Sequence, residues 1–389
     1  MKPKAFIPVE EFKERVAKAA ALVREWGLDA LIVNGSEADY ANTRYFSNFW
    51  PLFERCGVAI AANGDCALMV GPESEVFAQD KGVIDKVFVL YEYRESADPS
   101  YPELSFSTFQ DVFKAIGATN PEKIGVAAWL DTNVVMMEGI KNAFPKAEIV
   151  RADKIMTTLR SVKSENEIAC IREASRISNI AAMEVIKAIR PGITELQLVG
   201  VAQRAVYENG AEYEGLPMYC FAENSTKHAI SRCGYRELQM GDIVEVNPSA
   251  KVCGYSPSIG MPVSLGKLTP DRREMVEFGL EVHNWTFDRI KAGVIAGDIA
   301  KGFKKIYDDR GYGKNFLYGP CHGLGLIEVE APWMETTSDY ALKEGMTFQI
   351  DTFVTTDNYG LRWEKSIAVR KDGAEDLSPG IGKIYEVEL

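Results

Sequence analysis

The sequence is poor in the residues that mark several common classes of protein. It holds only three histidines in 389 residues, and its seven cysteines are odd in number and form no CxxC pair. Its first residues, MKPK, lack the apolar region of a signal peptide, so we predict reduced thiols and a cytoplasmic protein. No apolar run is long enough to span a bilayer. Basic residues are outnumbered, 44 to 56, and the net charge of −12 argues against nucleic acid or an anionic membrane as the main partner.

What remains is the composition of an ordinary globular protein, with a hydrophobic share of 46% and a charged share of 26%. A chain of 389 residues exceeds one ordinary core, so we expect two domains. A charge cluster followed by the capping box of Ser164 and Glu167 begins a long helix that runs to about Arg190. We therefore place the boundary just before this helix, with domains at 1–157 and 158–389.

The amino-terminal half alternates helical and strand-like segments. A helical pattern begins at Pro8 and ends at Gly27, and a buried strand follows at 29–33. Asn63-Gly64 joins two apolar runs in the strongest short-range signal of a β-hairpin. Further strands are predicted at 86–91, 123–127 and 147–150, and further helices at 106–116 and 133–144. Such alternation predicts an α/β domain, in which helices cover a sheet.

The carboxy-terminal half combines helices with strand-like runs. Beyond the helix that starts at Ser164, helices are predicted after Thr194, after Thr269 and over 298–309. Strands are predicted at 243–246, 260–263, 347–351 and 366–369. This order predicts an α+β domain, in which helices pack on a sheet of antiparallel type.

One segment of the amino-terminal half, residues 45–55, combines five aromatic rings with a single cation, Arg55. Its composition favours ordinary core aromatics at the approach to a hairpin. The alternative is a lid that presents Arg55 to an anion, because a guanidinium pairs with a carboxylate through two parallel hydrogen bonds.

The clearest candidate for chemistry is a set of three polar residues near the end of the chain. His322 lies among glycines in the segment 319–326, and Asp351 and Glu364 each close an apolar, strand-like run. Such residues predict a buried polar cluster, which either binds a divalent metal or works as a hydrogen-bonded acid–base group. Three donors are too few for a full two-metal centre.

The other two histidines differ in their surroundings. His228 lies in a polar loop ahead of a strand, where a mobile imidazole can reach a pocket, although a plain loop residue fits that sequence equally well. His283 lies in a helical pattern and is predicted to be a surface or satisfied helix residue. His228 is therefore the histidine to consider beside His322.

A series of short segments, in order, resembles the creatinase/aminopeptidase P/methionine aminopeptidase superfamily over nearly the whole chain. The segments are RSVKS (160–164) with Glu167, PGITE (191–195), GDIV (241–244), GY (254–255), HGLGL (322–326), GMTF (345–348) and LRWE (361–364). The resemblance implies the pita-bread fold for the α+β carboxy-terminal domain. It implies a creatinase-type fold for the α/β amino-terminal domain.

The metallopeptidases of this superfamily hold two metal ions with two aspartates, a histidine and two glutamates. By resemblance, these positions fall on Asn247, Ser258, His322, Asp351 and Glu364. An amide and a hydroxyl replace two charged ligands and a third side chain is shortened, so we predict that tight binding of two dications is lost. We accordingly predict no metal and no other cofactor.

The creatinase branch of the superfamily is metal-free and cleaves a C–N bond with a histidine as acid and base. By resemblance that histidine is His228, and creatinase shares the asparagine at Asn247 and the glutamate at Glu364. Its Phe-x-Arg motif binds the substrate carboxylate in the pocket of the neighbouring subunit. This motif matches Phe53 to Arg55 and implies a homodimer.

The chain also departs from creatinase at two positions. Gly260 stands where creatinase and ectoine hydrolase place a catalytic glutamate. Trp333 stands where creatinase places a second arginine for the carboxylate. The resemblance therefore does not imply that creatine is the substrate.

From these residues we predict metal-independent, creatinase-like hydrolysis of a C–N bond in a small substrate that carries a carboxylate and a cationic, amidine or guanidino-type group. His228 would move a proton from water to the leaving nitrogen, Glu364 and Asp351 would hold the positive charge of the substrate, and His322 would orient the cluster. Residues predicted to bind the substrate, with Arg55 on its carboxylate, are Trp50, Phe53, Tyr255, Trp333, Arg362 and Trp363.

Three alternatives stay open. An Xaa-Pro dipeptidase or aminopeptidase with a weakened metal site would require manganese or cobalt. A binding protein without activity would keep Arg55 and the aromatic pocket but form no product. A lyase would remove a proton next to the carboxylate and release an unsaturated product.

Overall fold

The chain divides into two units in the computed structural model, which describes residues 4–380 and 382–388. Ile7–Arg160 forms the amino-terminal unit, and Ser161–Leu389 forms most of the carboxy-terminal unit. The division lies close to the predicted boundary at 157–158. The first three residues, at which we predicted no signal peptide, lie outside the described residues. Within the described part of the chain, no helix is both long and apolar enough to cross a bilayer.

A mixed sheet forms the centre of the amino-terminal unit, with the strand order β4-β3-β2-β1-β5-β6. Its strands are β1 (Ala30–Gly35), β2 (Cys56–Ala61), β3 (Cys66–Val70), β4 (Val87–Val89), β5 (Lys123–Ala127) and β6 (Glu148–Arg151). The strand β1 pairs antiparallel with β2 and parallel with β5, and both β1 and β2 are buried throughout. The predicted hairpin is confirmed, because β2 and β3 pair antiparallel on either side of Asn63-Gly64.

Helices complete this unit as an α/β domain. They are α1 (Val9–Glu25), α2 (Ala41–Ser47), α3 (Glu75–Lys81), α4 (Phe109–Ala115), α5 (Val134–Ala143) and α6 (Asp153–Ser161), with a 3₁₀ turn η1 (Tyr91–Tyr93). Ile32 and Ala59 of the sheet share one apolar core with Val112 of α4 and Ile140 of α5. The strand predicted at 86–91 is shorter than expected, because η1 begins immediately after it.

Two sheets form the centre of the carboxy-terminal unit, with the orders β12-β11-β13-β14-β15 and β16-β10-β8. A bridge between Gly260 and Glu364 links them, and β7 (Tyr213–Glu214) pairs with β9 (Ala250–Lys251). The other strands are β8 (Ile243–Val246), β10 (Met261–Leu265), β11 (Cys321–Gly323), β12 (Glu330–Met334), β13 (Thr347–Thr355), β14 (Gly360–Val369), β15 (Ala374–Asp376) and β16 (Tyr385–Val387).

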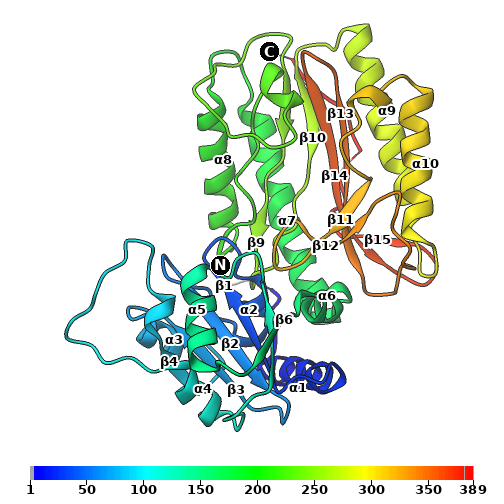
Figure 1. Cartoon of the computed structure of the whole chain (residues 1–389). Coiled ribbons are helices and arrows are strands. Elements are labelled where there is room, and N and C mark those ends of the chain that lie inside the picture. The colour runs from blue at the N-terminus through cyan, green and yellow to red at the C-terminus, as the bar shows by residue number, and fades with distance from the viewer. Residues whose placement is uncertain (1–3, 381, 389) are drawn as a thin grey trace. The chain divides into compact units, whose positions relative to one another are not determined.

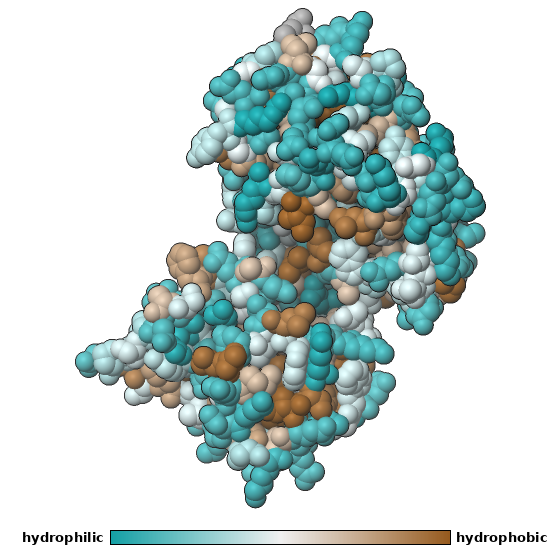
Figure 2. Space-filling model, turned by 45° about the horizontal axis from the view of Figure 1, so that its top comes forward, coloured by the Kyte–Doolittle hydropathy of each residue, from teal (hydrophilic) through white to brown (hydrophobic). Residues whose placement is uncertain are grey.

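Long helices flank these sheets. They are α7 (Glu165–Ala188), α8 (Glu195–Glu208), α9 (Pro270–Phe287) and α10 (Ala296–Asp309), with 3₁₀ turns η2 (Glu223–Lys227) and η3 (Gly313–Asn315). In Figure 1, α7 and α8 lie on one side of β10, β13 and β14, and α9 and α10 lie on the other. Both predicted capping boxes are present, at Ser164 with Glu167 and at Thr194 with Gln197. Hydrophilic residues cover most of the face in Figure 2, consistent with the net charge of −12.

The hairpin of β13 and β14 positions the polar residues of the carboxy-terminal unit. Its register places Asp351 opposite Glu364 and Phe353 opposite Arg362. Because side chains alternate along a strand, Asp351, Arg362 and Glu364 point to one face and Trp363 points to the other. The prediction that Asp351 and Glu364 close their strands was wrong, since both strands continue past them.

Candidate metal centre

Three buried side chains converge on the polar face of this hairpin. Their metal-binding atoms, one each from His322, Glu328 and Glu364, all lie within 4.8 Å of one another. His322 Nε2 is 3.7 Å from Glu328 Oε1, and His322 Nδ1 lies 3.0 Å from the carbonyl oxygen of Gly323. A nitrogen donor and two carboxylates are a suitable set for a divalent transition metal.

Glu328 reaches the cluster from the segment 324–329 between β11 and β12. Thr347 Oγ1 donates to the carbonyl oxygen of Leu324 at 2.6 Å, and the Ser256 N–H donates to that of Gly325 at 2.9 Å. A Cβ on Gly323 would lie 2.5 Å from the backbone carbonyl oxygen of Glu330, so glycine is required by a close approach of the backbone there. The glycines after His322 therefore shape the segment that delivers Glu328.

Asn247, which directly follows β8, and Ser258, which precedes β10, bind the two carboxylates. The Ser258 hydroxyl lies 2.7 Å from Glu364 Oε2 and 3.1 Å from Glu328 Oε1, and it donates to one of them at a time. The Asn247 amide N–H₂ donates to Glu364 Oε2. Asn247 Oδ1 is buried and has no hydrogen-bond partner among the described residues. Gly260 permits this contact, because a Cβ there would lie 2.6 Å from Asn247 Nδ2.

The two glutamates oppose each other electrostatically. Burial raises the pKa of Glu364 well above its usual range, and the charges of Asp351 and Glu328 raise it further. Burial also raises the pKa of Glu328, although His322 acts in the opposite direction. Both shifts mean that the ionised pair is costly in the protein alone, and a bound cation would remove that cost.

Asp351 has a different partner. Its Oδ1 forms an ion pair at 3.0 Å with Nε of Arg362, and both side chains are buried. Arg362 Nη2 also donates at 2.9 Å to the hydroxyl oxygen of Tyr318 and to the carbonyl oxygen of Ala229. The Arg362 backbone N–H donates to Glu245, whose pKa burial raises to about 8. Arg362 is therefore engaged by the protein on several sides.

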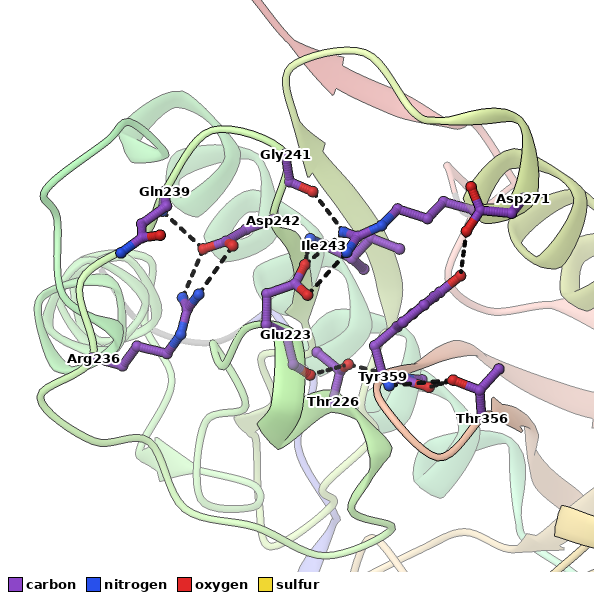
Figure 3. Close-up of polar contacts among 12 residues, drawn as sticks. Glu223, Thr226, Arg236, Gln239, Gly241, Asp242, Ile243, Asp271, Thr356 and Tyr359 are labelled. Atoms are coloured by element: carbon purple, nitrogen blue, oxygen red, sulfur yellow. Dashed lines mark hydrogen bonds and ion pairs between the residues drawn. The ribbon is translucent and has the colours of Figure 1, made fainter.

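The segment that carries His228 follows η2 and is firmly held. The Glu223 carboxylate, shown in Figure 3, accepts from the Ile243 N–H at 2.8 Å. It also accepts from both terminal nitrogens of Arg272, at 2.6 and 3.0 Å. The Thr226 hydroxyl donates to the carbonyl oxygen of Glu223 at 2.6 Å. His228 itself is exposed, with Nδ1 3.4 Å from the Ser231 hydroxyl. The structure therefore does not bring His228 into the buried cluster.

The structure separates the other predicted substrate-binding residues of this unit. Trp333 pairs with His322 across β11 and β12, its ring lies 5.4 Å from the imidazole, and it is 38% exposed. Trp363 is fully buried against α9, and its Nε1 donates to the carbonyl oxygen of Val276 at 3.2 Å. Tyr255 is also buried, and its hydroxyl donates to Glu167 at 2.6 Å. Placing Trp363 and Tyr255 at the substrate was wrong, because both pack in the core.

In the amino-terminal unit, the aromatic segment is part helix and part loop. Its first residues belong to α2, and Trp50 Nε1 donates to the carbonyl oxygen of Glu37 at 3.0 Å. Phe53 is 73% exposed and has a φ of 61°. Arg55 is half-buried and close enough to Asp131 to lower the pKa of that carboxyl, although burial raises it more. Binding of a substrate by Trp50, Phe53 and Arg55 stays a prediction.

The sequence analysis missed Glu328. The residue lies six positions after His322, in Leu326-Ile327-Glu328, where an acid follows apolar residues. A single acid in such a run resembles an ordinary surface turn, and its orientation depends on the glycines around it. Only contacts distant in sequence, such as that with Ser258, identify it as part of the cluster.

Two family models match the chain. The model described as metallopeptidase family M24 matches residues 169–371, and the model described as creatinase/prolidase N-terminal domain matches residues 15–162. The Xaa-Pro dipeptidase of Pyrococcus furiosus is 25% identical over 94% of this chain and 98% of its own. The Xaa-Pro dipeptidase of Pyrococcus horikoshii is 24% identical over 94% of this chain and 97% of its own.

Solved structures give the same fold. An X-Pro aminopeptidase from Thermotoga maritima matches with a TM-score of 0.82 and 23% identity, covering 96% of this chain and 99% of its own. The prolidase of Pyrococcus horikoshii matches with a TM-score of 0.81 and 22% identity, also covering 96% and 99%. The predicted fold, a creatinase-type domain followed by a pita-bread domain, is confirmed.

The prediction of a metal-independent, creatinase-like hydrolase was wrong. Two relatives that match over nearly the full length are Xaa-Pro dipeptidases, and the matching family is one of metallopeptidases. The error has two physical origins. The prediction counted too few metal donors because it left out Glu328, and it gave a proton-transfer role to His228, which is exposed. Since the M24 model covers more than half of the chain, the protein is a hydrolase that belongs to metallopeptidase family M24.

Proposed function

We propose that the protein is a divalent-cation-dependent dipeptidase that hydrolyses the amide bond between an amino-terminal residue and proline. The observation that carries this proposal is the buried cluster of His322, Glu328 and Glu364, which lies inside the region matched by the M24 model. The Xaa-Pro dipeptidases that match nearly the whole chain support the choice of substrate.

The donor set fits one divalent cation. An imidazole nitrogen and two carboxylate oxygens match the ligand preferences of zinc, manganese and cobalt. The unpartnered Oδ1 of Asn247 lies in the same cluster and offers a neutral oxygen. A bound cation there would polarise the scissile carbonyl and lower the pKa of a bound water.

The remaining polar residues of the face can manage the proton and the substrate. Asp351, which lies opposite Glu364 but outside the His322 cluster, would accept the proton of the attacking water and return it to the proline nitrogen. Arg362 would hold the Asp351 carboxylate in place for that transfer. The partly exposed ring of Trp333, beside His322, would pack against the pyrrolidine ring of the substrate.

The amino-terminal unit would contribute to binding. A dipeptide carries a free carboxylate, and Arg55 remains the residue that we propose binds it, with Phe53 and Trp50 beside it, across a homodimer. An Arg55→Ala variant should then raise KM with little change in kcat. Light scattering of the purified protein would test the dimer. We also propose that the protein is cytoplasmic, and its seven cysteines, none of which forms a disulfide, support this proposal.

The test is hydrolysis by purified protein that has been stripped with a chelator and then supplied with manganese, cobalt or zinc. We expect release of proline from Leu-Pro and Met-Pro only after a cation is added, and much slower cleavage of Leu-Ala. His322→Ala should abolish the activity, while Glu335→Gln, which changes an exposed acid, should leave it intact. Failure of the folded, cation-loaded protein to cleave any Xaa-Pro peptide would refute the proposal.

A further inference from the structure

We infer that the cluster of His322, Glu328 and Glu364 holds one divalent cation per chain, that Glu328 is one of its ligands, and that the guanidinium of Arg362 is a second, fixed positive charge on the polar face. The inference deepens the proposed function and rests on it for the cation. Its distinctive content is the number of ions and the identity of the ligands.

Glu328 qualifies as a ligand because it is held in position before any ion binds. Its segment is fixed by the backbone contacts of Leu324 and Gly325, and the buried side chains of Leu324 and Leu326 anchor it in the core. Its Oε1 faces both His322 Nε2, at 3.7 Å, and the Ser258 hydroxyl, at 3.1 Å. A carboxylate so restrained loses little conformational freedom when it binds an ion.

Asn247 gives a second, independent sign of a ligand at this place. Its side chain is completely buried, its Nδ2 is used by Glu364, and its Oδ1 has no partner among the described residues. A buried carbonyl oxygen without a partner costs free energy, and a cation in the cluster would remove that cost. The orphan oxygen and the three charged or ionisable donors therefore indicate the same ion.

A second ion lacks a charged ligand of its own. Asn247 and Ser258 are uncharged. The charge of the remaining acid of the face, Asp351, is balanced by Arg362, whose Nε lies 3.0 Å from Asp351 Oδ1, although these two atoms are not aligned for a hydrogen bond. The guanidinium cannot withdraw easily, because Tyr318 and Ala229 accept hydrogen bonds from it at 2.9 Å. A dication beside this fixed positive charge would be repelled in a medium of low dielectric constant. Arg362 therefore balances the charge of Asp351, and a single ion would balance the charges of Glu328 and Glu364.

The inference is tested by counting ions without any substrate. Chelator-treated protein is titrated with Mn²⁺ alone by calorimetry, and the product is checked by elemental analysis after dialysis. We expect one ion per chain, and the same stoichiometry for Asp351→Asn. Two ions bound per wild-type chain with similar affinity would overturn the inference.

Glu328→Gln identifies the ligand. It should weaken Mn²⁺ binding by about a hundredfold or more, since even partners outside the first ligand shell cost 10- to 100-fold. Glu335→Gln is the matched control, because it makes the same chemical change at an exposed position and should leave the affinity unchanged. Melting temperatures of the ion-free proteins identify any variant that fails to fold. If Glu328→Gln fails to fold, Ser258→Ala serves as a second variant, because it removes the hydroxyl that donates to Glu328. Unchanged affinity in folded Glu328→Gln would exclude Glu328 as a ligand.

The two proposals fail separately. A protein that binds one ion through Glu328 but cleaves no Xaa-Pro peptide would refute the proposed function and leave the ion site standing. A protein that cleaves these peptides with two ions bound would refute the inference and leave the function standing.

Discussion

Two buried histidines lie on opposite faces of the β13–β14 hairpin, and only one of them marks a site. On the polar face, His322 is 3.7 Å from the carboxylate of Glu328. On the helix face, His283 of α9 has Nδ1 3.3 Å from Thr352 Oγ1, and its Nε2 has no partner among the described residues. Burial lowers the pKa of His283 to about 3, and Lys365 acts in the same direction. The prediction of a helix residue at His283 is confirmed, but the side chain is buried and not at the surface, and only one of its two ring nitrogens has a partner among the described residues.

The difference between the faces lies in charge rather than in burial. The polar face gathers acids and one arginine, which require partners or an ion. The helix face gathers Trp363 and apolar residues of α9, which require close packing, and its lysine, Lys365, is paired with Asp376 at 2.8 Å. A buried titratable group is therefore a sign of chemistry only where opposite charges converge on it. Three groups of substitutions test this contrast, beginning with the group of largest expected effect.

Removal of the buried positive charge of Arg362 should lower the free energy of unfolding more than any of the other substitutions. Arg362→Met leaves Asp351 buried without its partner and frees the carbonyl of Ala229. Loss of one member of a buried ion pair costs about 3–5 kcal/mol of unfolding free energy. Urea denaturation of the ion-free wild type and variant should show this difference.

A double variant separates the charge from the packing of Arg362. Asp351→Asn removes the orphaned charge, so Arg362→Met with Asp351→Asn should recover much of the loss, and the two substitutions should not be additive. Equal losses in the single and double variants would mean that packing, and not charge, is the contribution of Arg362.

The sequence was sufficient for the fold and for part of this contrast. Capping boxes, the Asn63-Gly64 turn and alternating apolar runs predicted the elements, because those signals are local. The alternation in Arg362-Trp363-Glu364 also predicted that the strand has two different faces. Which of these faces is covered by a helix depends on where α9 packs, and that is not visible in the local sequence. Glu328 could not be found in this way, because its role depends on contacts with residues distant in the chain.

Two glycines, one beside each face of the hairpin, provide a matched pair of alanine substitutions. A Cβ on Gly260 would lie 2.6 Å from Asn247 Nδ2 and 2.8 Å from Glu364 Cβ, whereas a Cβ on Gly279 would lie 2.9 Å from Leu361 and 3.0 Å from Trp363. Overpacking of either kind costs about 1–3 kcal/mol. In α9, alanine regains about 1 kcal/mol of helix propensity, so the net loss for Gly279→Ala should be about 1 kcal/mol.

The readout that separates the pair is ion binding. Gly260→Ala should weaken Mn²⁺ affinity by about tenfold or more, because it displaces a carboxylate of the cluster. Gly279→Ala should lower the melting temperature and leave that affinity unchanged. Calorimetric titration and thermal melting measure both quantities, and a loss of ion affinity in Gly279→Ala would contradict the separation of the faces.

The smallest expected effect is the pH dependence that His283 imposes on the helix face. Its pKa in the folded protein is about 3, against an ordinary value of 6.5, so the unfolded chain takes up a proton below pH 6.5 while the folded protein does not. Stability is therefore present above pH 6.5 and is lost as the pH falls, by about 1 kcal/mol between pH 7 and 5.5. His283→Gln removes this linkage, so its unfolding free energy should fall by about 1 kcal/mol less than that of the wild type over the same interval. His228→Gln, which removes an exposed imidazole, is the matched control and should follow the wild type. If His283→Gln also followed the wild type, the imidazole of His283 would have to take up a proton in the folded protein, and the helix face would not exclude a protonated imidazole.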